Sequence, residues 1–292
     1  IWKNDCKKII IELSKLKGLR VISRGSAMMF QDSTKLYSEI AEKLGVDLLL
    51  EGSVIYSTDS LRVIVQLIEP SRKERHLWAS KYDQNSSNIF HLADDISSQI
   101  AKEIHLVVSP EVAKNQVKQV DPKAYELYLR GKYLWYQQNT AAMKNAIKYL
   151  KESIEIDSSY APAYSTLAEA YISINKFILN NEEKLQNRID SRIAIINALN
   201  KAIELDGSLG DAFITKGNML GKFDWDWEGM KKMAEKGLQI NPNNSYGYIL
   251  LSNYHLVKGD LGNAINVALV AEKLDPLNPR TGCLVAETYF MD

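Results

Sequence analysis

The sequence predicts a chain in two parts: an α+β domain, with a mixed sheet that includes an antiparallel meander, followed by an all-α array of helical repeats. Three observations predict this fold class. Apolar residues follow a period of two across much of 46–83, which is typical of strands. From residue 121 they follow the period of about 3.6 that is typical of amphipathic helices. A closing Asp or Asn followed by Pro, Gly or Ser recurs there at a spacing near 34 residues, once interrupted by about 15 more, which indicates a repeat array.

Composition limits the classes of partner. The 292 residues contain 36 Lys and Arg against 36 Asp and Glu, so no global positive field would attract nucleic acid, and we expect no nucleic-acid partner. Apolar runs all fall short of the roughly 18 residues that a membrane helix needs, so we expect no membrane insertion within this chain. The first residue is Ile1 rather than methionine, so we expect sequence upstream. The compartment stays open: cytoplasmic, or periplasmic if a transmembrane helix lies upstream.

The first elements alternate between helix and strand. Apolar residues at helical spacing predict a helix over 3–17, and the short apolar run 19–23 predicts a buried strand. Residues 24–33 read as a loop. A second helical stripe covers 36–44, and Gly45 follows it as a natural stop.

An antiparallel meander follows. Alternating apolar residues predict strands over 46–56, 61–67 and 76–83, joined by short turns. Gly52 interrupts the first strand, which predicts a bulge or a point of close packing. A helical stripe then covers 89–108.

Five runs of this part of the chain stand out together. They are LRVISRGSAM (19–28), EKLGVDLLLEGSV (42–54), LRVIVQLIE (61–69), HLWASKYD (76–83) and IFHLADDIS (89–97). Together they resemble the TolB-amino-terminal-like domain of bacterial signalling proteins. In that family a first parallel strand precedes the first helix, and this sequence lacks it, so the resemblance implies one unfilled position in the sheet. The polar, proline-containing stretch 109–120 reads as a linker, so the predicted domains are 1–108, 109–120 and 121–292.

The helical pattern from residue 121 resolves into four repeats and a truncated fifth. Asp121 is a good helix N-cap, and Pro122 suits the first turn because its missing N–H is no loss there. The second repeat takes up the extra residues, which should lengthen its two helices or their loop. The repeats begin at Asp121, Ala161, Gly210, Ser245 and Pro279.

These features resemble tetratricopeptide repeats over residues 121–292. The pattern is clearest in 245–278, where small or apolar residues stand at the expected places before the closing Asp275-Pro276. Together with the TolB-like runs and the turn DWDWEG (224–229), the chain resembles a module appended to winged-helix transcriptional regulators of the acid-sensing type, to class III nucleotide cyclases and to some serine/threonine kinases.

Residues that could form a catalytic or metal-binding site are far apart in the sequence. The four histidines, at 76, 91, 105 and 255, stand apart in sequence and none is beside a candidate nucleophile or metal partner. Cys6 and Cys283 stand near opposite ends, so we expect no metal, no cofactor and no catalytic constellation in this chain. Any catalytic domain would lie outside it. Alternation places Glu51 on the solvent face of its strand. Trp225 and Trp227 are expected to fill the gap between repeats, with a ligand-stacking pair as the alternative.

The resemblance to tetratricopeptide repeats implies that the first helix of each repeat lines a concave groove. Isoleucine stands at 214 and 249, where a carboxylate clamp would need lysine, so we expect a groove with apolar anchors and amide contacts instead. The implied groove residues are Glu126, Leu129, Tyr136, Ser165, Glu169, Ile172, Asp211, Ile214, Asn218, Lys222, Tyr246, Ile249, Asn253, Leu256 and Val257.

Two functions follow as hypotheses. In the first, the chain is a non-catalytic protein-interaction and sensory module of a larger bacterial signalling or transcription-regulatory protein, and it binds a peptide or protein partner in the groove. In the second, it is the C-terminal regulatory region of a class III adenylate or guanylate cyclase. Homodimerisation is left open.

Overall fold

The computed structural model describes residues 10, 13–14, 19–31, 33–56, 60–70, 74–85, 120–137, 139–177 and 184–291. Residues 118–241 form one compact unit, and residues 2–117 together with 242–292 form the other, so the repeats are divided between the two units. Most of the predicted helix 3–17, the predicted helix 89–108 and nearly all of the predicted linker lie outside the described residues. The predicted domain boundaries therefore stay a prediction.

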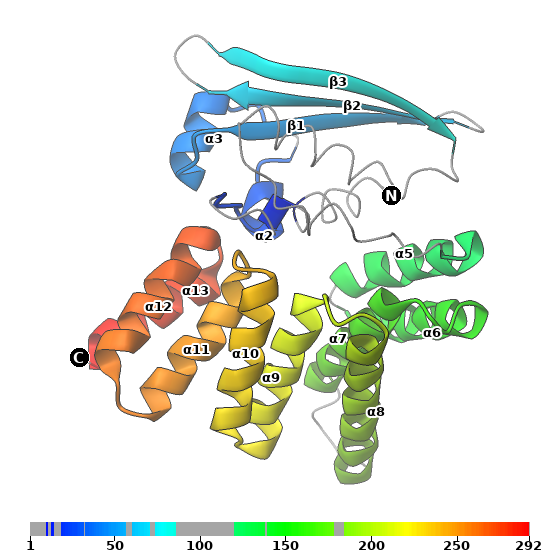
Figure 1. Ribbon diagram of the computed structural model, residues 1–292, viewed down its shortest axis with the longest axis vertical. Coiled ribbons are helices and arrows are strands. Elements are labelled where there is room, and N and C mark those ends of the chain that lie inside the picture. Colours follow the sequence, from blue (N-terminus) through cyan, green and yellow to red (C-terminus); the bar gives the residue numbers. More distant parts are fainter. Residues whose placement is uncertain are drawn as a thin grey trace. The chain divides into compact units, whose positions relative to one another are not determined.

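The second unit contains a small sheet (Figure 1). Helix α2 (Arg24–Met28) and helix α3 (Tyr37–Leu44) precede three strands, β1 (Leu49–Tyr56), β2 (Ser60–Glu69) and β3 (Arg75–Asn85). The strands pair antiparallel in the order β1-β2-β3, which confirms the meander. Among the described residues the sheet contains no parallel pair, so the predicted mixed sheet is not seen there.

The register of the sheet corrects one prediction. Gly52 pairs with Val65 in a ladder between β1 and β2 that runs unbroken, so the predicted bulge at Gly52 is wrong. The irregularity lies instead between β2 and β3: Leu67 pairs with Trp78 and Ile68 with His76, so the extra residue is Leu77 of β3. Val63, Val65, Leu67 and Ile68 are all buried. The alternate residues Val63, Val65 and Leu67 lie on one face of β2, and this face contributes to the core.

The predicted strand 19–23 is also wrong. This segment is extended but joins no strand of the described part, and α2 begins directly after it, within the predicted loop. Ser23 caps α2, since its side chain accepts a 3.2 Å hydrogen bond from the backbone N–H of Ser26. The helix predicted over 36–44 is confirmed as α3, and Gly45 ends it in the left-handed conformation (φ 62°) that favours glycine.

The predicted repeats are confirmed as helices. α5 begins after Asp121, whose side chain accepts from the N–H groups of Lys123 (2.8 Å) and Ala124 (3.1 Å). α8 has 22 residues, so the extra residues of the second repeat lengthen its second helix. The helices are α5 (Pro122–Tyr136), α6 (Thr140–Ile156), α7 (Ala161–Phe177), α8 (Lys184–Leu205), α9 (Gly210–Asp224) and α10 (Trp227–Ile240) in the first unit, and α11 (Ser245–Val257), α12 (Leu261–Leu274) and α13 (Pro279–Met291) in the second.

Each repeat pairs its two helices through a small residue on the first. A Cβ at Gly131 would lie 2.7 Å from Leu150 Cγ, and one at Gly217 would lie 3.0 Å from the carbonyl oxygen of Met230. Ser252 is fully buried and donates a 2.9 Å hydrogen bond to the Ala264 carbonyl.

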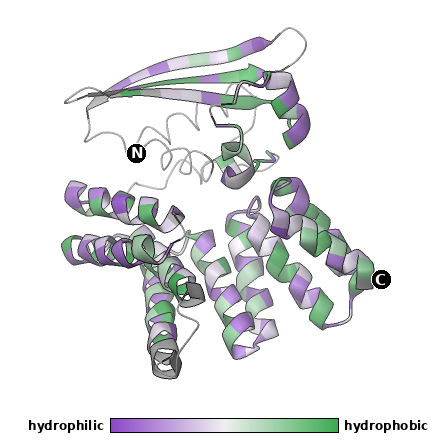
Figure 2. Ribbon diagram, turned by 180° about the vertical axis from the view of Figure 1, so that it is seen from behind, coloured by the Kyte–Doolittle hydropathy of each residue, from purple (hydrophilic) through white to green (hydrophobic). Residues whose placement is uncertain are grey.

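First helices of successive repeats also pack on each other, α5 on α7 and α7 on α9 in one unit, and α11 on α13 in the other. Hydrophobic and hydrophilic residues alternate in bands along these helices (Figure 2), as expected where one face is buried. Helices that pair within a repeat and also pack on the next repeat form the layered core of a helical repeat array.

Candidate functional site

The close-packed small residues give the repeats a common register. They are Gly131, Ala168, Gly217 and Ser252, one on the first helix of each of the four complete repeats. The residues that directly follow them are therefore equivalent, and these include the predicted Glu169, Asn218 and Asn253. In the first repeat the predicted Glu126 and Leu129 each lie one residue beyond the equivalent positions, which Tyr125 and Tyr128 occupy.

Three predicted groove residues lie inside the repeats. Ser165 is 7% exposed, Ile214 1% and Ile249 2%. Ile214 packs against α10 beside Gly237, and Ile249 packs against Ala268 of α12. Their side chains support helix pairing, so they are not offered to a partner in this structure. The sequence could not show this because the same helical position is buried or exposed according to the residue opposite it.

The remaining predicted residues are accessible to different degrees. Leu129 and Ile172 pack partly against the hydrophobic clusters of the first unit, so they present apolar edges rather than whole side chains. The side chain of Tyr136 is not among those that the structure describes. Half-buried side chains are Glu126, Leu129, Glu169, Ile172, Asp211, Asn218, Tyr246, Asn253 and Leu256, and exposed ones are Lys222 and Val257.

An aromatic cluster that the sequence reasoning missed stands on α5 and before α7. The rings of Tyr125 and Tyr128 lie 6.0 Å apart, and the ring of Tyr160 meets Tyr128 edge-on at 5.1 Å. Lys132 Nζ donates a 2.7 Å hydrogen bond to the Tyr128 hydroxyl and lies 4.9 Å from that ring. Burial raises the pKa of Tyr160 well above its usual value, so the phenol stays neutral. The signal in the sequence was the run of tyrosines at helical spacing in α5.

A polar contact links the first helices of two repeats. Trp135 Nε1 on α5 donates a 3.2 Å hydrogen bond to Ser173 Oγ on α7. Because the indole N–H can only donate, this bond fixes the orientation of the ring. The first-helix faces of the first two repeats are thereby held in a defined register.

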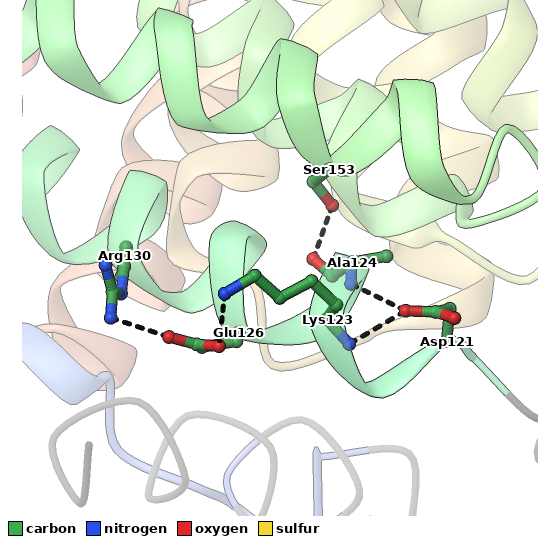
Figure 3. Close-up of polar contacts among 6 residues, drawn as sticks. All are labelled: Asp121, Lys123, Ala124, Glu126, Arg130 and Ser153. Carbon is green, nitrogen blue, oxygen red and sulfur yellow. Dashed lines mark hydrogen bonds and ion pairs between the residues drawn. The ribbon is translucent and has the colours of Figure 1, made fainter.

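Glu126 is paired on both of its carboxylate oxygens (Figure 3). Lys123 Nζ lies 3.0 Å from Oε2, and Arg130 lies 2.6 Å from Oε1. The hydrogen bond from Lys123 is the main cause that lowers the pKa of Glu126, so the group stays charged. Nearby, Ser153 donates a 2.6 Å hydrogen bond to the Ala124 carbonyl and ties α6 to α5.

The second unit carries a comparable face on α11 and α13. The guanidinium of Arg280 lies 4.8 Å from the centre of the Tyr246 ring, a cation–π contact between the first helices of successive repeats. Burial raises the pKa of Tyr246. Val257, near the end of α11, is 51% exposed. This face therefore combines a cation, an amide at Asn253 and apolar side chains.

Trp225 corrects another prediction. The sequence predicts that it fills a gap between repeats, yet its side chain is 73% exposed, and it contacts Trp227 edge-on with centroids 5.8 Å apart. Its backbone is left-handed (φ 56°), a conformation that costs a bulky residue about 1–2 kcal/mol. Asp226 then caps α10 by accepting a 2.8 Å hydrogen bond from the Gly229 N–H.

The titratable residues of the described part form no metal-binding group of three or more His, Cys, Asp or Glu. Glu51 is exposed, as predicted, and a hydrogen bond to it is the main cause that raises the pKa of Tyr37 to about 12. His76 is exposed, with Nδ1 3.0 Å from Gln66 Oε1. Of the helices described, none is both long and apolar enough to cross a membrane.

Helix pairs joined through small residues, with successive first helices in contact, have the organisation of tetratricopeptide repeats. A sequence relative is "Putative adenylate cyclase 3" of Rhizobium meliloti (strain 1021), 30% identical over 202 residues, which are 68% of this chain and 33% of the relative. The chain thus spans about a third of the length of that curated relative. No known protein-family profile matches the sequence.

Several solved proteins are similar in structure. One is a thermophilic TPR protein of Thermus thermophilus, with TM-score 0.48 and 12% identity over 70% of this chain and 99% of that one. Another is MamA from Desulfovibrio magneticus RS-1, with TM-score 0.42 and 15% identity over 59% and 86%. YrrB, described as a TPR protein with an unusual peptide-binding site, has TM-score 0.40 and 16% identity over 62% and 80%. Since these scores are below 0.5, the assignment of repeats rests on the helix pairs of this chain.

Proposed function

We propose that the chain is a protein-interaction and sensory module of a larger bacterial signalling protein, and that its first helices bind a peptide or protein partner. The observation that carries this proposal is the equivalence of Glu169, Asn218 and Asn253, which stand directly after the close-packed small residue of three repeats and stay half-buried. Their side chains are polar groups on rigid helices, which suits recognition of a partner's backbone.

Amide side chains suit this role because each offers both a donor and an acceptor, as a peptide group does. The partly covered Leu129 and Ile172 supply apolar edges beside the polar residues of the first unit. A partner that binds one conformation of the module better than another would shift its population, which is how binding would reach an attached effector.

The test is a pair of double variants. Asn218→Ala with Asn253→Ala removes the two proposed amide contacts, and Asn145→Ala with Asn266→Ala removes two exposed asparagines from the second helices α6 and α12. A partner captured with the wild-type chain is identified and its dissociation constant is measured for each protein. We expect about tenfold weaker binding for the first pair, since each hydrogen bond contributes about 0.5–1.5 kcal/mol, and little change for the second. Equal dissociation constants for wild type and both variants would refute the proposal.

A second candidate is the regulatory region of a class III nucleotide cyclase. The likeness to a protein named as an adenylate cyclase favours it. The test is to read the coding sequence contiguous with Ile1 and to assay the natural full-length protein for conversion of ATP to cyclic AMP. A cyclase domain with activity that the Asn218→Ala, Asn253→Ala double variant alters is the expected result. A winged-helix domain without cyclase activity would exclude this candidate and support transcription regulation.

A further inference from the structure

The four closing turns of the repeats occupy equivalent places but differ in sequence, including at their third residue. They are residues 157–159 (DSS), 206–208 (DGS), 241–243 (NPN) and 275–277 (DPL). The third residue of each turn is Ser159, Ser208, Asn243 or Leu277. The first two turns belong to the first unit, and Asn243 and Leu277 belong to the second.

In the first two turns this third residue caps its own turn. Asp157 Oδ1 accepts hydrogen bonds from the Ser159 N–H (2.9 Å) and hydroxyl (2.8 Å). Asp206 Oδ1 accepts from the Ser208 N–H (2.9 Å) and hydroxyl (2.6 Å) in the same way. The closing aspartate and the serine thus satisfy each other within one turn.

In the third turn the same position binds a distant segment. Asn243 Nδ2 donates to the carbonyl oxygens of Ser14 (2.9 Å) and Leu19 (3.1 Å), and its Oδ1 accepts from the Val21 N–H (3.1 Å). One amide side chain therefore holds three backbone groups of the chain's N-terminal part. Ser159 and Ser208 could not do this, because a hydroxyl has a single proton to donate.

In the fourth turn the serine partners come from the distant segment instead. Asp275 is buried, and its Oδ1 accepts from the hydroxyl of Ser26 (2.7 Å) and from that of Ser23. Ser26 Oγ in turn accepts a 3.0 Å hydrogen bond from the Leu277 N–H, and the Ser23 N–H donates to the Leu274 carbonyl at 2.8 Å. Ser23 and Ser26 thus take the place that the turn's own serine has in the first two repeats.

Leu277 and Arg20 add apolar and charged contacts. Leu277 packs against the cluster of Ile22, Ile40 and Leu44, so a residue of the repeats enters the core beneath α3. Arg20 donates to the Lys273 carbonyl (3.0 Å) at the end of α12 and to the Gly45 carbonyl at the end of α3. A guanidinium between two helix C-termini is favourable because both carry partial negative charge.

We propose that the closing turns of the third and fourth repeats are an intramolecular docking surface, and that segment 19–27, which comprises the extended residues 19–23 and most of α2, is its occupant. Asn243 and Leu277 determine which turns accept the segment, since they replace the serine that would make a turn self-sufficient. The docked segment couples α3 and the sheet to the last repeats. A partner that binds either part would therefore act on the other through this contact, whether or not the first helices bind a peptide.

The test compares two neighbouring asparagines in the full chain. Asn243→Asp removes both donated hydrogen bonds and places a carboxylate against two carbonyl oxygens. Asn244→Asp makes the same chemical change one residue later, where the side chain caps α11 by accepting from the Gly247 N–H (3.0 Å), a role that aspartate performs equally well. Hydrogen exchange of the backbone amides in 19–27 is measured by mass spectrometry for each protein.

We expect exchange in 19–27 to be about tenfold faster in Asn243→Asp and unchanged in Asn244→Asp, because unsatisfied buried polar groups open a contact to roughly this degree. Exchange within α11 and α12 should stay at the wild-type rate, which shows that the repeats remain folded. Leu277→Ser is the second variant: it recreates the self-capping turn, frees Ser23 and Ser26, and should also speed exchange in 19–27. Equal exchange in Asn243→Asp and Asn244→Asp, or no response to Leu277→Ser, would overturn the proposal.

Discussion

Gly237→Ala should destabilise the pairing of α9 and α10, although alanine is the better helix former. The added Cβ would lie 2.8 Å from the Gly210 carbonyl oxygen and 2.5 Å from Ile214 Cγ1. A mid-helix change from glycine to alanine gains about 1 kcal/mol. Overpacking costs about 1–3 kcal/mol, and here the upper part of that range applies because a backbone carbonyl must move. The net loss in the free energy of unfolding is therefore about 1–2 kcal/mol.

Gly282→Ala is the matched control for this prediction. Gly282 lies inside α13, and a Cβ built there meets nothing within 4 Å. The substitution should raise the free energy of unfolding by about 0.5–1 kcal/mol, because glycine loses more conformational freedom on folding. Both variants are measured by urea unfolding followed by circular dichroism at the helix band. A Gly237→Ala protein as stable as wild type, beside a stabilised Gly282→Ala, would refute the close approach of α9 and α10.

Two further predictions concern single side chains. Trp225→Gly should raise the free energy of unfolding by up to about 1 kcal/mol, because glycine adopts the left-handed backbone at 225 without strain; a decrease on urea unfolding would show that the contact with Trp227 outweighs the strain. Lys123→Ala should raise the pKa of Glu126 toward its ordinary value, since the Lys123 bond is the main cause that lowers it. Stability from this pair is present above the ordinary carboxyl pKa and is lost as pH falls through the lowered one. An unchanged Glu126 titration midpoint by NMR would contradict this.

The helices and the meander could be predicted because their signals are local. The small residues Gly131, Gly217 and Ser252 stand at helical spacing from the apolar stripes, and each allows the close approach that its repeat needs. Gly45 ends α3 for a reason that concerns its own backbone alone. Such features need no knowledge of distant parts of the chain, so periodicity and turn chemistry were sufficient.

The errors arose where a distant partner decides the structure. Residues 19–23 have the apolar pattern of a strand, but the backbone of Val21 and Ser23 bonds to Asn243 and Leu274 rather than to a neighbouring strand. Ile214 has the helical position of a groove residue, yet Gly237 leaves room that its side chain fills. Trp225 is the reverse case: its bulk predicts a buried side chain, but the side chain is exposed and the backbone is left-handed. In each case the sequence near the residue is compatible with both outcomes.

The closing turns show how repeats of one design acquire different roles. In a turn that contains Asp and Ser, one carboxylate oxygen accepts both hydrogen bonds that the serine donates. The second oxygen of Asp157 accepts from the N–H of Asp121 in the same repeat, at 3.3 Å. When the serine is replaced by Leu277, the carboxylate of Asp275 needs hydroxyl donors from elsewhere, and burial makes that need costly to leave unmet. The replacement therefore both frees the acceptor and supplies an apolar side chain to hold the segment that brings the donors. Departure from the repeat pattern, rather than agreement with it, marks the turns that bind another part of the protein.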